Sequence, residues 1–229
     1  MHRTFAQRLV YDILRALARL VVVWFFRFRV TGRQHWPAAG GALVCANHQS
    51  YLDPPLVGLT CSRRMTYLGR TTLFENKLLA PIISFLDTIP IDREGGGLSG
   101  LKETLRRLKG GDMVLIFPEG TRTSDGQLQP LKPGFIAVAR RSKVPLVPVA
   151  LDGAYDIWPR TSPLPRGGRL AVVIGEPISA AEVSQLSDEE LIEKLTRRIK
   201  QCLDEARQLR GRRRSGLQAF VADECRHVA

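Results

Sequence analysis

Five short apolar runs alternate with longer amphipathic stretches, and this alternation constrains the fold more than any other feature of the sequence. The runs are rich in Val, Ile or Leu and are bounded by turn residues, which is typical of buried strands. They are ALVCA (42–46), MTYLG (65–69), MVLIF (113–117), VPLVPVAL (144–151) and RLAVVIG (169–175). The helical stretches between them are 54–60, 72–86, 98–109 and 133–142. The pattern predicts an α/β domain with a mixed, largely parallel sheet covered by helices.

This domain has a recognisable beginning and end. A Gly- and Pro-rich linker, TGRQHWPAAGG (31–41), marks its start. A long final helix is predicted at its end, with Ser187 as N-cap and Glu190 completing a capping box. The predicted organisation is an N-terminal membrane-associated helical segment (1–30), the α/β domain with its C-terminal helix (31–210), and a basic, flexible tail (211–229).

The first 30 residues combine six arginines and a single acid, Asp12, with large apolar side chains such as Leu17 and Trp24. This composition is typical of an amphipathic helix that lies on a membrane with its arginines among the headgroups. The alternative is a helix packed on the core with a solvated basic face. The longest apolar run, 20–26, is far shorter than the roughly 20 residues of a spanning helix. We therefore expect a monotopic or peripheral protein on the cytoplasmic face of a membrane.

The chain carries 34 Lys and Arg against 22 Asp and Glu, a net charge of +12. Such an excess indicates an anionic partner, either an anionic membrane surface, a phosphorylated substrate or nucleic acid. A nucleic-acid binder would explain the charge but not the motifs described next. The four cysteines form no CxxC pair and have no histidines at metal-ligand spacing, so we expect no bound metal.

The segment NHQSYLD (47–53) follows the first predicted strand and contains His48 and Asp53. Five residues apart, these side chains lie about 140° apart on a helix and on opposite faces of a strand, so they meet only across a turn. In a turn, the Asp53 carboxylate could orient His48 as a general base. The alternative is structural: Asp53 and Pro54 read as the N-cap and first residue of a helix, with His48 a turn histidine. Spacing alone does not decide between them.

A second motif, FPEGTRT (117–123), ends another predicted strand. Pro118 stops the strand, Gly120 permits a tight turn, and Arg122 projects where open α/β sheets bind ligands. The planar fork of Arg122 suits a phosphate group. The alternative is a solvated loop arginine paired with Glu119.

Two further segments are less specific. IPIDRE (89–94) places Arg93 near another strand end. VPLVPVALDG (144–153) contains two prolines, which disfavour an undistorted central strand and indicate an edge, a bulge or a wall near a ligand.

Taken in order, these four segments closely resemble the glycerolipid acyltransferase family, which includes bacterial 1-acyl-glycerol-3-phosphate acyltransferases. The family's H-x4-D motif is matched by His48 and Asp53, and its FPEGTR motif is complete at 117–122. Its arginine block resembles 91–93, and its proline-containing fourth block resembles 144–151 with Pro148 as the counterpart. Family members often carry a lysine after the second strand, where this chain has Arg70.

The resemblance implies transfer of an acyl group from acyl-CoA or acyl carrier protein to lysophosphatidic acid, forming phosphatidic acid without a cofactor. His48 would be the general base, oriented by Asp53. The substrate-binding residues implied are Arg70, Arg93, Glu119, Gly120, Thr121, Arg122 and Pro148. Another lysolipid acceptor, a lipid or thioester hydrolase, and a non-catalytic membrane protein are the alternatives. The hydrolase would need a nucleophile elbow, which the sequence lacks, and the non-catalytic protein would have lost His48 or Asp53.

Overall fold

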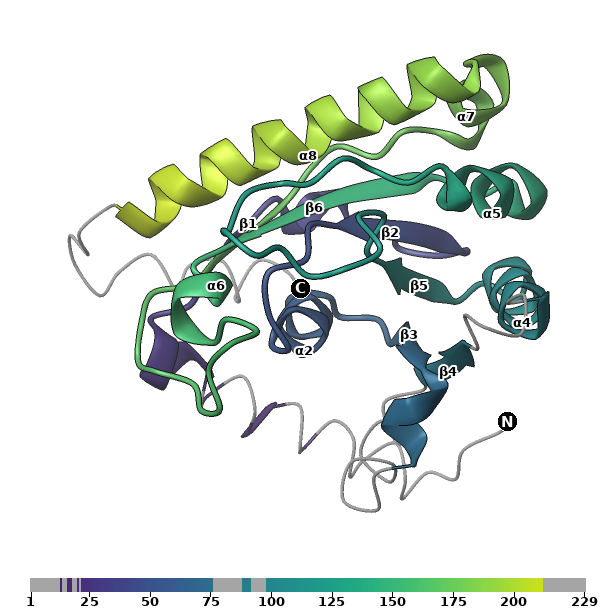
Figure 1. Cartoon of the computed structure of the whole chain (residues 1–229). Helices are drawn as coiled ribbons and strands as arrows, with labels where there is room; N and C mark the ends of the chain where they lie inside the picture. Colours follow the sequence, from purple (N-terminus) through teal and green to yellow (C-terminus); the bar gives the residue numbers. More distant parts are fainter. Residues whose placement is uncertain are drawn as a thin grey trace.

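The computed structural model describes residues 22–75, 88–91 and 98–211, together with residues 13, 16, 17 and 20. Its centre is a seven-stranded sheet with the order β1-β7-β6-β2-β5-β3-β4 (Figure 1). The strands are β1 (Arg29–Thr31), β2 (Ala42–Ala46), β3 (Met65–Arg70), β4 (Thr88–Ile91), β5 (Met113–Ile116), β6 (Leu146–Asp152) and β7 (Ala171–Ile174). All neighbouring strands pair in parallel except β6 and β7, which are antiparallel. The expectation of a mixed, largely parallel sheet is confirmed.

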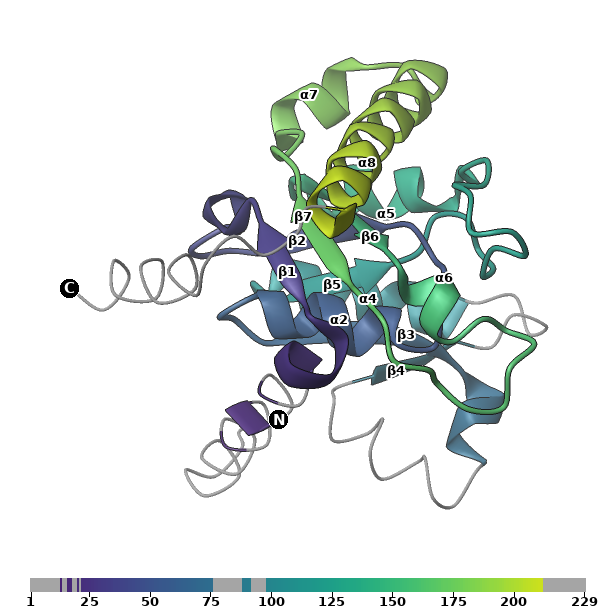
Figure 2. The ribbon, with the colours of Figure 1, turned by 90° about the vertical axis from the view of Figure 1, so that its left-hand side faces the viewer.

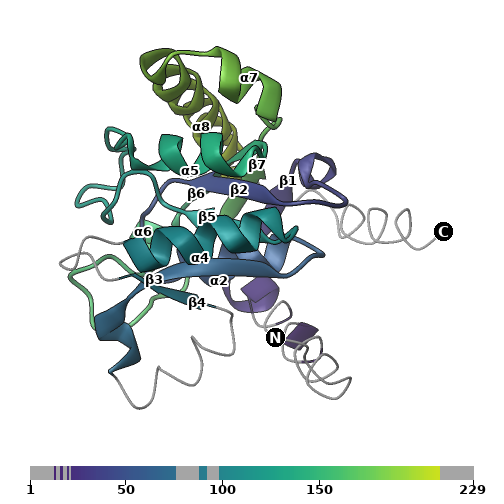
Figure 3. The same cartoon turned by 90° about the vertical axis from the view of Figure 1, so that its right-hand side faces the viewer.

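Helices cover both faces of the sheet (Figures 1 and 3). The described helices are α2 (Asp53–Thr60), α4 (Leu98–Lys109), α5 (Gly134–Ser142), α6 (Ala154–Ile157), α7 (Ala180–Gln185) and α8 (Asp188–Gly211), with short 3-10 turns η1 (Arg33–His35) and η2 (Thr71–Phe74). Along the fully buried strand β2, Val44 packs with α2 and α6, whereas Leu43 and Cys45 pack with α4, α5 and α8. Side chains alternate between the faces of a strand, so β2 contributes to both halves of the core.

Most predicted elements are confirmed, because long apolar runs and strongly periodic helices carry a clear signal. The predicted helix over 72–86 begins instead as the short turn η2, and residues 76–87 lie outside the described part of the chain. The structure adds β1, α6 and α7, which the sequence patterns do not predict. Strand β1 begins at Arg29, so the sheet includes the last two residues of the segment expected to precede the domain. The tail from residue 212 onward, expected to be flexible, also lies outside the described residues.

Strand β6 tolerates proline because the sheet contains a bulge beside it. It lies between β2 and β7 and is not an edge strand, so the edge expectation is wrong. Leu146 pairs with Ile178 and Val149 with Ile174, so three residues, 175–177, lie opposite only two on β6. The Pro148 carbonyl still accepts a hydrogen bond from the Gly175 N–H at 2.8 Å. The bulge interrupts the ladder of backbone hydrogen bonds beside Pro148, so the strand does not need the N–H that proline lacks.

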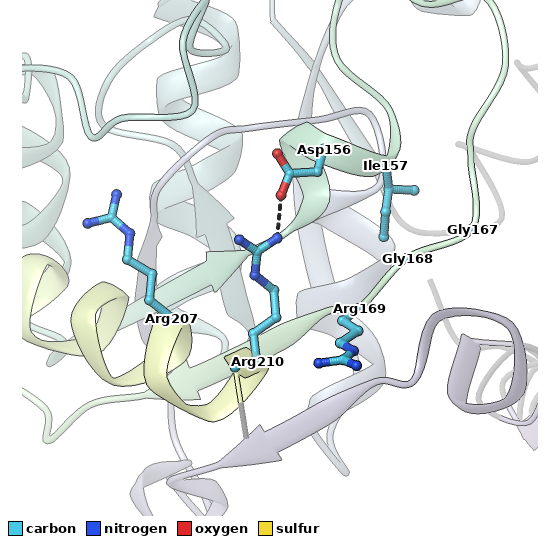
Figure 4. Close-up of a pocket in the computed structure, with 8 residues that line it drawn as sticks. Asp156, Ile157, Gly167, Gly168, Arg169, Arg207 and Arg210 are labelled. Carbon is cyan, nitrogen blue, oxygen red and sulfur yellow. Dashed lines mark hydrogen bonds and ion pairs between the residues drawn. The ribbon is translucent and has the colours of Figure 1, made fainter. Parts of the chain in front are cut away.

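Helix α8 runs across β6 and β7 (Figure 2) and is fixed at both ends. At its N-terminus the predicted capping box is present: the Glu190 N–H donates to Ser187 Oγ at 3.1 Å, and the Ser187 N–H donates to Glu190 Oε2 at 2.8 Å. In its last turn, Arg210 pairs with Asp152 at 2.5 Å and with Asp156 (Figure 4). This pair of contacts attaches the end of α8 to the carboxyl end of β6 and to α6.

Candidate active site

The two strongest motifs meet at one edge of the sheet. Strands β2 and β5 are parallel neighbours, so NHQSYLD and FPEGTR both leave the sheet at its carboxyl edge. The His48 and Phe117 rings stack there, with centroids 3.9 Å apart and planes 14° from parallel. The stack fixes the plane of the imidazole beside the FPEGTR loop.

His48 and Asp53 are in direct contact across the predicted turn. His48 Nδ1 lies 2.8 Å from Asp53 Oδ2, and the same oxygen accepts the backbone N–H groups of Gln49 at 2.5 Å and Ser50 at 2.7 Å. Helix α2 begins at Asp53, Leu52 occupies the N-cap position, and no side chain caps the helix. The N-cap alternative for Asp53 is therefore wrong, because its carboxylate binds the turn that precedes the helix.

The electrostatics of this pair follow from its burial. Asp53 is completely buried, which raises the pKa of its carboxyl group, and the hydrogen bonds from His48, Ser50 and Gln49 oppose that rise. His48 keeps 19% of its side chain exposed. Since Nδ1 donates to Asp53, the remaining ring nitrogen, Nε2, is left with its lone pair. The arrangement provides a partly accessible base with a buried carboxylate behind it.

Glu119 connects the loops of the site through their backbones. Its Oε1 accepts the His48 N–H at 2.6 Å and its Oε2 accepts the Gln129 N–H at 2.8 Å. Burial raises the pKa of Glu119 to about 7, against the lowering effect of these hydrogen bonds. The proposed pairing of Glu119 with Arg122 is therefore not observed, because both carboxylate oxygens bind backbone amides. Gly120 adopts φ +74°, which confirms the predicted tight turn.

Arg122 lies against the ring of Tyr51, which is a residue of the NHQSYLD turn. Its guanidinium carbon is 3.6 Å from the Tyr51 ring centroid. Its Nη1 atom is buried and has no hydrogen-bond partner among the residues that the structure describes. A buried guanidinium N–H without an acceptor is costly, and an oxygen of a bound anion would satisfy it.

Three polar residues around His48 hold the NHQSYLD turn in place, and the sequence patterns do not predict these roles. Asn47 exchanges two hydrogen bonds with the backbone of Leu151, at 2.8 and 2.9 Å. Ser50 Oγ donates to the Trp158 carbonyl at 2.8 Å, and Gln49 bonds the backbone of the 126 and 155 positions. The run of polar residues around His48 was the only sequence pattern that could have indicated these roles. The hydrogen-bond partners lie about 75 to 110 positions away along the chain, so local sequence does not identify them.

The remaining predicted substrate-binding residues are placed differently. Thr121 is exposed next to Arg122. Arg70 ends β3 at the same edge of the sheet, but its side chain lies outside the described residues, and so does all of Arg93. The structure does not bring Pro148 to the site, since it pairs with Cys45 within the sheet and its ring faces Gly175.

Among the described residues, no group of three or more His, Cys, Asp or Glu side chains is arranged to hold a metal ion. None of the helices in the same part of the chain has the length and hydropathy needed to cross a membrane.

Comparisons with known proteins identify the family of this chain. The Acyltransferase family model matches residues 27–152. The 1-acyl-sn-glycerol-3-phosphate acyltransferase of Bacillus subtilis (strain 168) is 32% identical over 178 residues, covering 77% of this chain and 86% of that protein. A chloroplastic 1-acyl-sn-glycerol-3-phosphate acyltransferase of Brassica napus is 29% identical over 181 residues, and the chain spans about half of its length (52%).

The fold has a solved counterpart. The structure is similar to the crystal structure of the 1-acyl-sn-glycerophosphate (LPA) acyltransferase PlsC from Thermotoga maritima, with a TM-score of 0.76 and 25% sequence identity over 91% of this chain and 83% of that one. The resemblance seen in the ordered motifs is thereby confirmed. The chain belongs to the acyltransferase family and is an enzyme of the 1-acylglycerol-3-phosphate O-acyltransferase-like type.

Proposed function

We propose that this enzyme transfers a fatty acyl group from acyl-CoA or acyl carrier protein to the free hydroxyl of lysophosphatidic acid, producing phosphatidic acid. The observation that carries the proposal is the contact of His48 with buried Asp53 next to an Arg122 guanidinium that lacks an acceptor. The names of the relatives in Bacillus subtilis and Brassica napus support the same acceptor class. The base and the cation lie on two adjoining segments, which are joined by the hydrogen bond from the Thr123 N–H to the His48 carbonyl at 2.8 Å, as acylation of a phosphorylated alcohol requires.

In the proposed mechanism, His48 Nε2 takes the proton from the acceptor hydroxyl as its oxygen attacks the thioester carbonyl. Asp53 stabilises the imidazolium that forms, through the Nδ1–H hydrogen bond. The tetrahedral intermediate then collapses, the C–S bond breaks, and the proton on His48 passes to the departing thiolate. General base catalysis of this kind contributes about 10²–10⁴-fold in rate.

The acceptor phosphate is proposed to bind Arg122 through charge-assisted hydrogen bonds. Arg70 and Arg93 are proposed as further phosphate ligands because their positions on β3 and after β4 follow the family motifs. Glu119 and Gly120 shape the acceptor pocket indirectly, by holding the loop that carries Thr121 and Arg122.

We further propose that the N-terminal segment lies on an anionic membrane at the cytoplasmic face. Ile13, Leu17, Leu20 and Trp24 recur at helical spacing and expose 50%, 53%, 59% and 86% of their surface. Such a stripe of exposed apolar side chains marks a contact surface. Phe26, by contrast, is buried in the core. The core-packed alternative therefore holds for the end of the segment, where Val22 and Val23 also pack against the core, and the exposed stripe supports the interfacial proposal for the residues before it.

The test is an assay of thiol release from acyl-CoA, and from acyl carrier protein as alternative donor, with a panel of lysolipids. We expect release that depends on lysophosphatidic acid and yields phosphatidic acid. No release with any acceptor and either donor would refute the proposal, and release that is indifferent to acceptor would indicate a hydrolase.

Two variants assign the roles. His48→Ala should abolish transfer, and a cooperative urea unfolding transition should show that the variant is still folded. Arg122→Ala should raise KM for lysophosphatidic acid but not for monoacylglycerol, whereas Arg141→Ala, an exposed arginine on α5, serves as the matched charge control. Persistent activity in His48→Ala would contradict the assigned base.

A further inference from the structure

We propose that Tyr51 is a positioning residue for Arg122, and that its ring sets the preference of the enzyme for phosphorylated acceptors. This inference rests on the proposed function. Tyr51 is one of the four residues between His48 and Asp53 and lies three residues after His48. It exposes 52% of its surface, so it is not held there by the core. Its ring instead lies 3.6 Å beneath the Arg122 guanidinium carbon and 5.6 Å from the Trp158 ring.

The stack gives Arg122 a defined orientation. A free arginine side chain loses rotamer entropy when it binds a ligand. A guanidinium that already lies on an aromatic face has lost part of that freedom before the ligand arrives. Nη1 of Arg122 is buried and has no acceptor in the described part of the chain, so the stack holds a guanidinium whose hydrogen-bonding capacity is not used up by the protein.

The Tyr51 ring is itself held by the turn that contains His48 and Asp53. Ser50, the residue before Tyr51, donates its N–H to Asp53 and its hydroxyl to the Trp158 carbonyl. The Trp158 indole N–H donates to the Ser162 carbonyl at 3.0 Å, which fixes the second ring. Tyr51 therefore couples the position of the phosphate ligand to the position of the base, since both are set by one short turn.

The experiment compares Tyr51→Leu with Tyr51→Phe. Phenylalanine retains the aromatic face, and no hydrogen bond of the Tyr51 hydroxyl is found among the described residues. We expect Tyr51→Leu to raise KM for lysophosphatidic acid roughly three- to tenfold, as loss of a cation–π contact predicts. The kcat should stay within about twofold, the unfolding midpoint should not change, and Tyr51→Phe should restore the wild-type KM. With monoacylglycerol as acceptor, all three proteins should behave alike.

A double-mutant cycle tests whether Tyr51 acts through Arg122. In the Arg122→Ala background, Tyr51→Leu should have no further effect on KM. An equal loss in both backgrounds, or an equal loss with monoacylglycerol, would overturn the inference, because the ring would then contact the acceptor directly or serve the fold alone.

A binding measurement separates this inference from the proposed function. Titration calorimetry with glycerol 3-phosphate reports phosphate binding without turnover. We expect weaker binding to Tyr51→Leu than to wild type or Tyr51→Phe by the same factor. Equal dissociation constants for the three proteins would refute the role of Tyr51. If Tyr51→Leu binds glycerol 3-phosphate more weakly but no protein transfers an acyl group, the proposed reaction is refuted and the phosphate site is retained.

Discussion

Replacing Asp53 by asparagine should separate the catalytic role of this carboxylate from its structural role. Oδ2 accepts three N–H groups, and Oδ1 has no hydrogen-bond partner among the described residues. In Asp53→Asn the carbonyl oxygen takes the place of Oδ2, because three donors select an acceptor there. The amide nitrogen takes the place of Oδ1. The variant therefore keeps the turn and the orientation of His48 but loses the negative charge.

The size of the effect follows from the geometry. Opposite unit charges about 4 Å apart attract by about 4 kcal/mol at an effective dielectric constant of about 20. Loss of that attraction for the imidazolium in the transition state corresponds to about 10³-fold in kcat. Burial raises the pKa of Asp53, so ionising this carboxyl group costs more in the folded state than in the unfolded state, and wild-type stability decreases as pH rises above the ordinary value. Asp53→Asn escapes this loss, but its amide nitrogen takes the buried place of Oδ1, which has no hydrogen-bond partner among the described residues. We therefore expect its stability at pH 7 to lie between those of wild type and Asp53→Ala.

Asp53→Ala is the matched comparison. It leaves the N–H groups of Gln49 and Ser50 without an acceptor, at a cost of about 1–3 kcal/mol each. We expect Asp53→Ala to be inactive and clearly less stable than Asp53→Asn, which loses kcat by about 10³-fold but keeps an acceptor for both N–H groups. Thiol-release kinetics and urea unfolding of the two variants provide the measurements. If Asp53→Asn retains more than about a tenth of the wild-type kcat, or unfolds as easily as Asp53→Ala, the reasoning is wrong.

Three further predictions concern stability. Because burial raises the pKa of Glu119 from 4.5 to about 7, the free energy of unfolding should fall by up to about 3 kcal/mol as pH rises from about 4.5 to about 7. Glu119→Gln should lack this slope in urea titrations at a series of pH values, and parallel profiles would contradict the assignment. Arg210→Ala removes the ion pair of Asp152 and should destabilise the protein by about 1–3 kcal/mol at pH 7. The loss should be smaller at an acidic pH at which Asp152 is protonated, and thermal unfolding at neutral and acidic pH measures both values. Gly32→Ala places a methyl group 1.9 Å from the Ile174 carbonyl oxygen, whereas Gly40→Ala has a similar φ and open space. The first should cost clearly more than the roughly 1–2 kcal/mol of left-handed strain that both share, and equal unfolding midpoints would refute the clash.

The sheet was predictable where its strands are long and apolar. Strand β2 is buried on both faces, so its five residues read as an uninterrupted apolar run. Strand β1 has only three residues, and α6 has four. Both are formed by packing against distant parts of the chain, which leaves too short a pattern in the local sequence. The bulge beside Pro148 was one of three alternatives, and only the pairing of residues 174–178 with β6 distinguishes them.

The site was predictable in its residues but not in their connections. The motifs identified His48, Asp53 and Arg122, because residue types and order carry that information. Whether Asp53 caps α2 or binds the preceding turn depends on where its carboxylate points, and the Asp-Pro sequence allows both. Glu119 was expected near the acceptor pocket, but its partners are the amides of His48 and Gln129. Such contacts involve the backbone of distant segments and leave no signature in side-chain composition.

The proposed base and the proposed phosphate ligand are held by different contacts. His48 is held through Asp53, which begins α2, and that helix buries Leu56 and Val57 against the sheet. Arg122 is held by its loop and by the half-exposed ring of Tyr51. Substitutions of that ring should therefore change the position of Arg122 more than that of His48. Acceptor preference should accordingly change more readily than the acyl-transfer chemistry, since the first depends on one exposed stack and the second on buried packing.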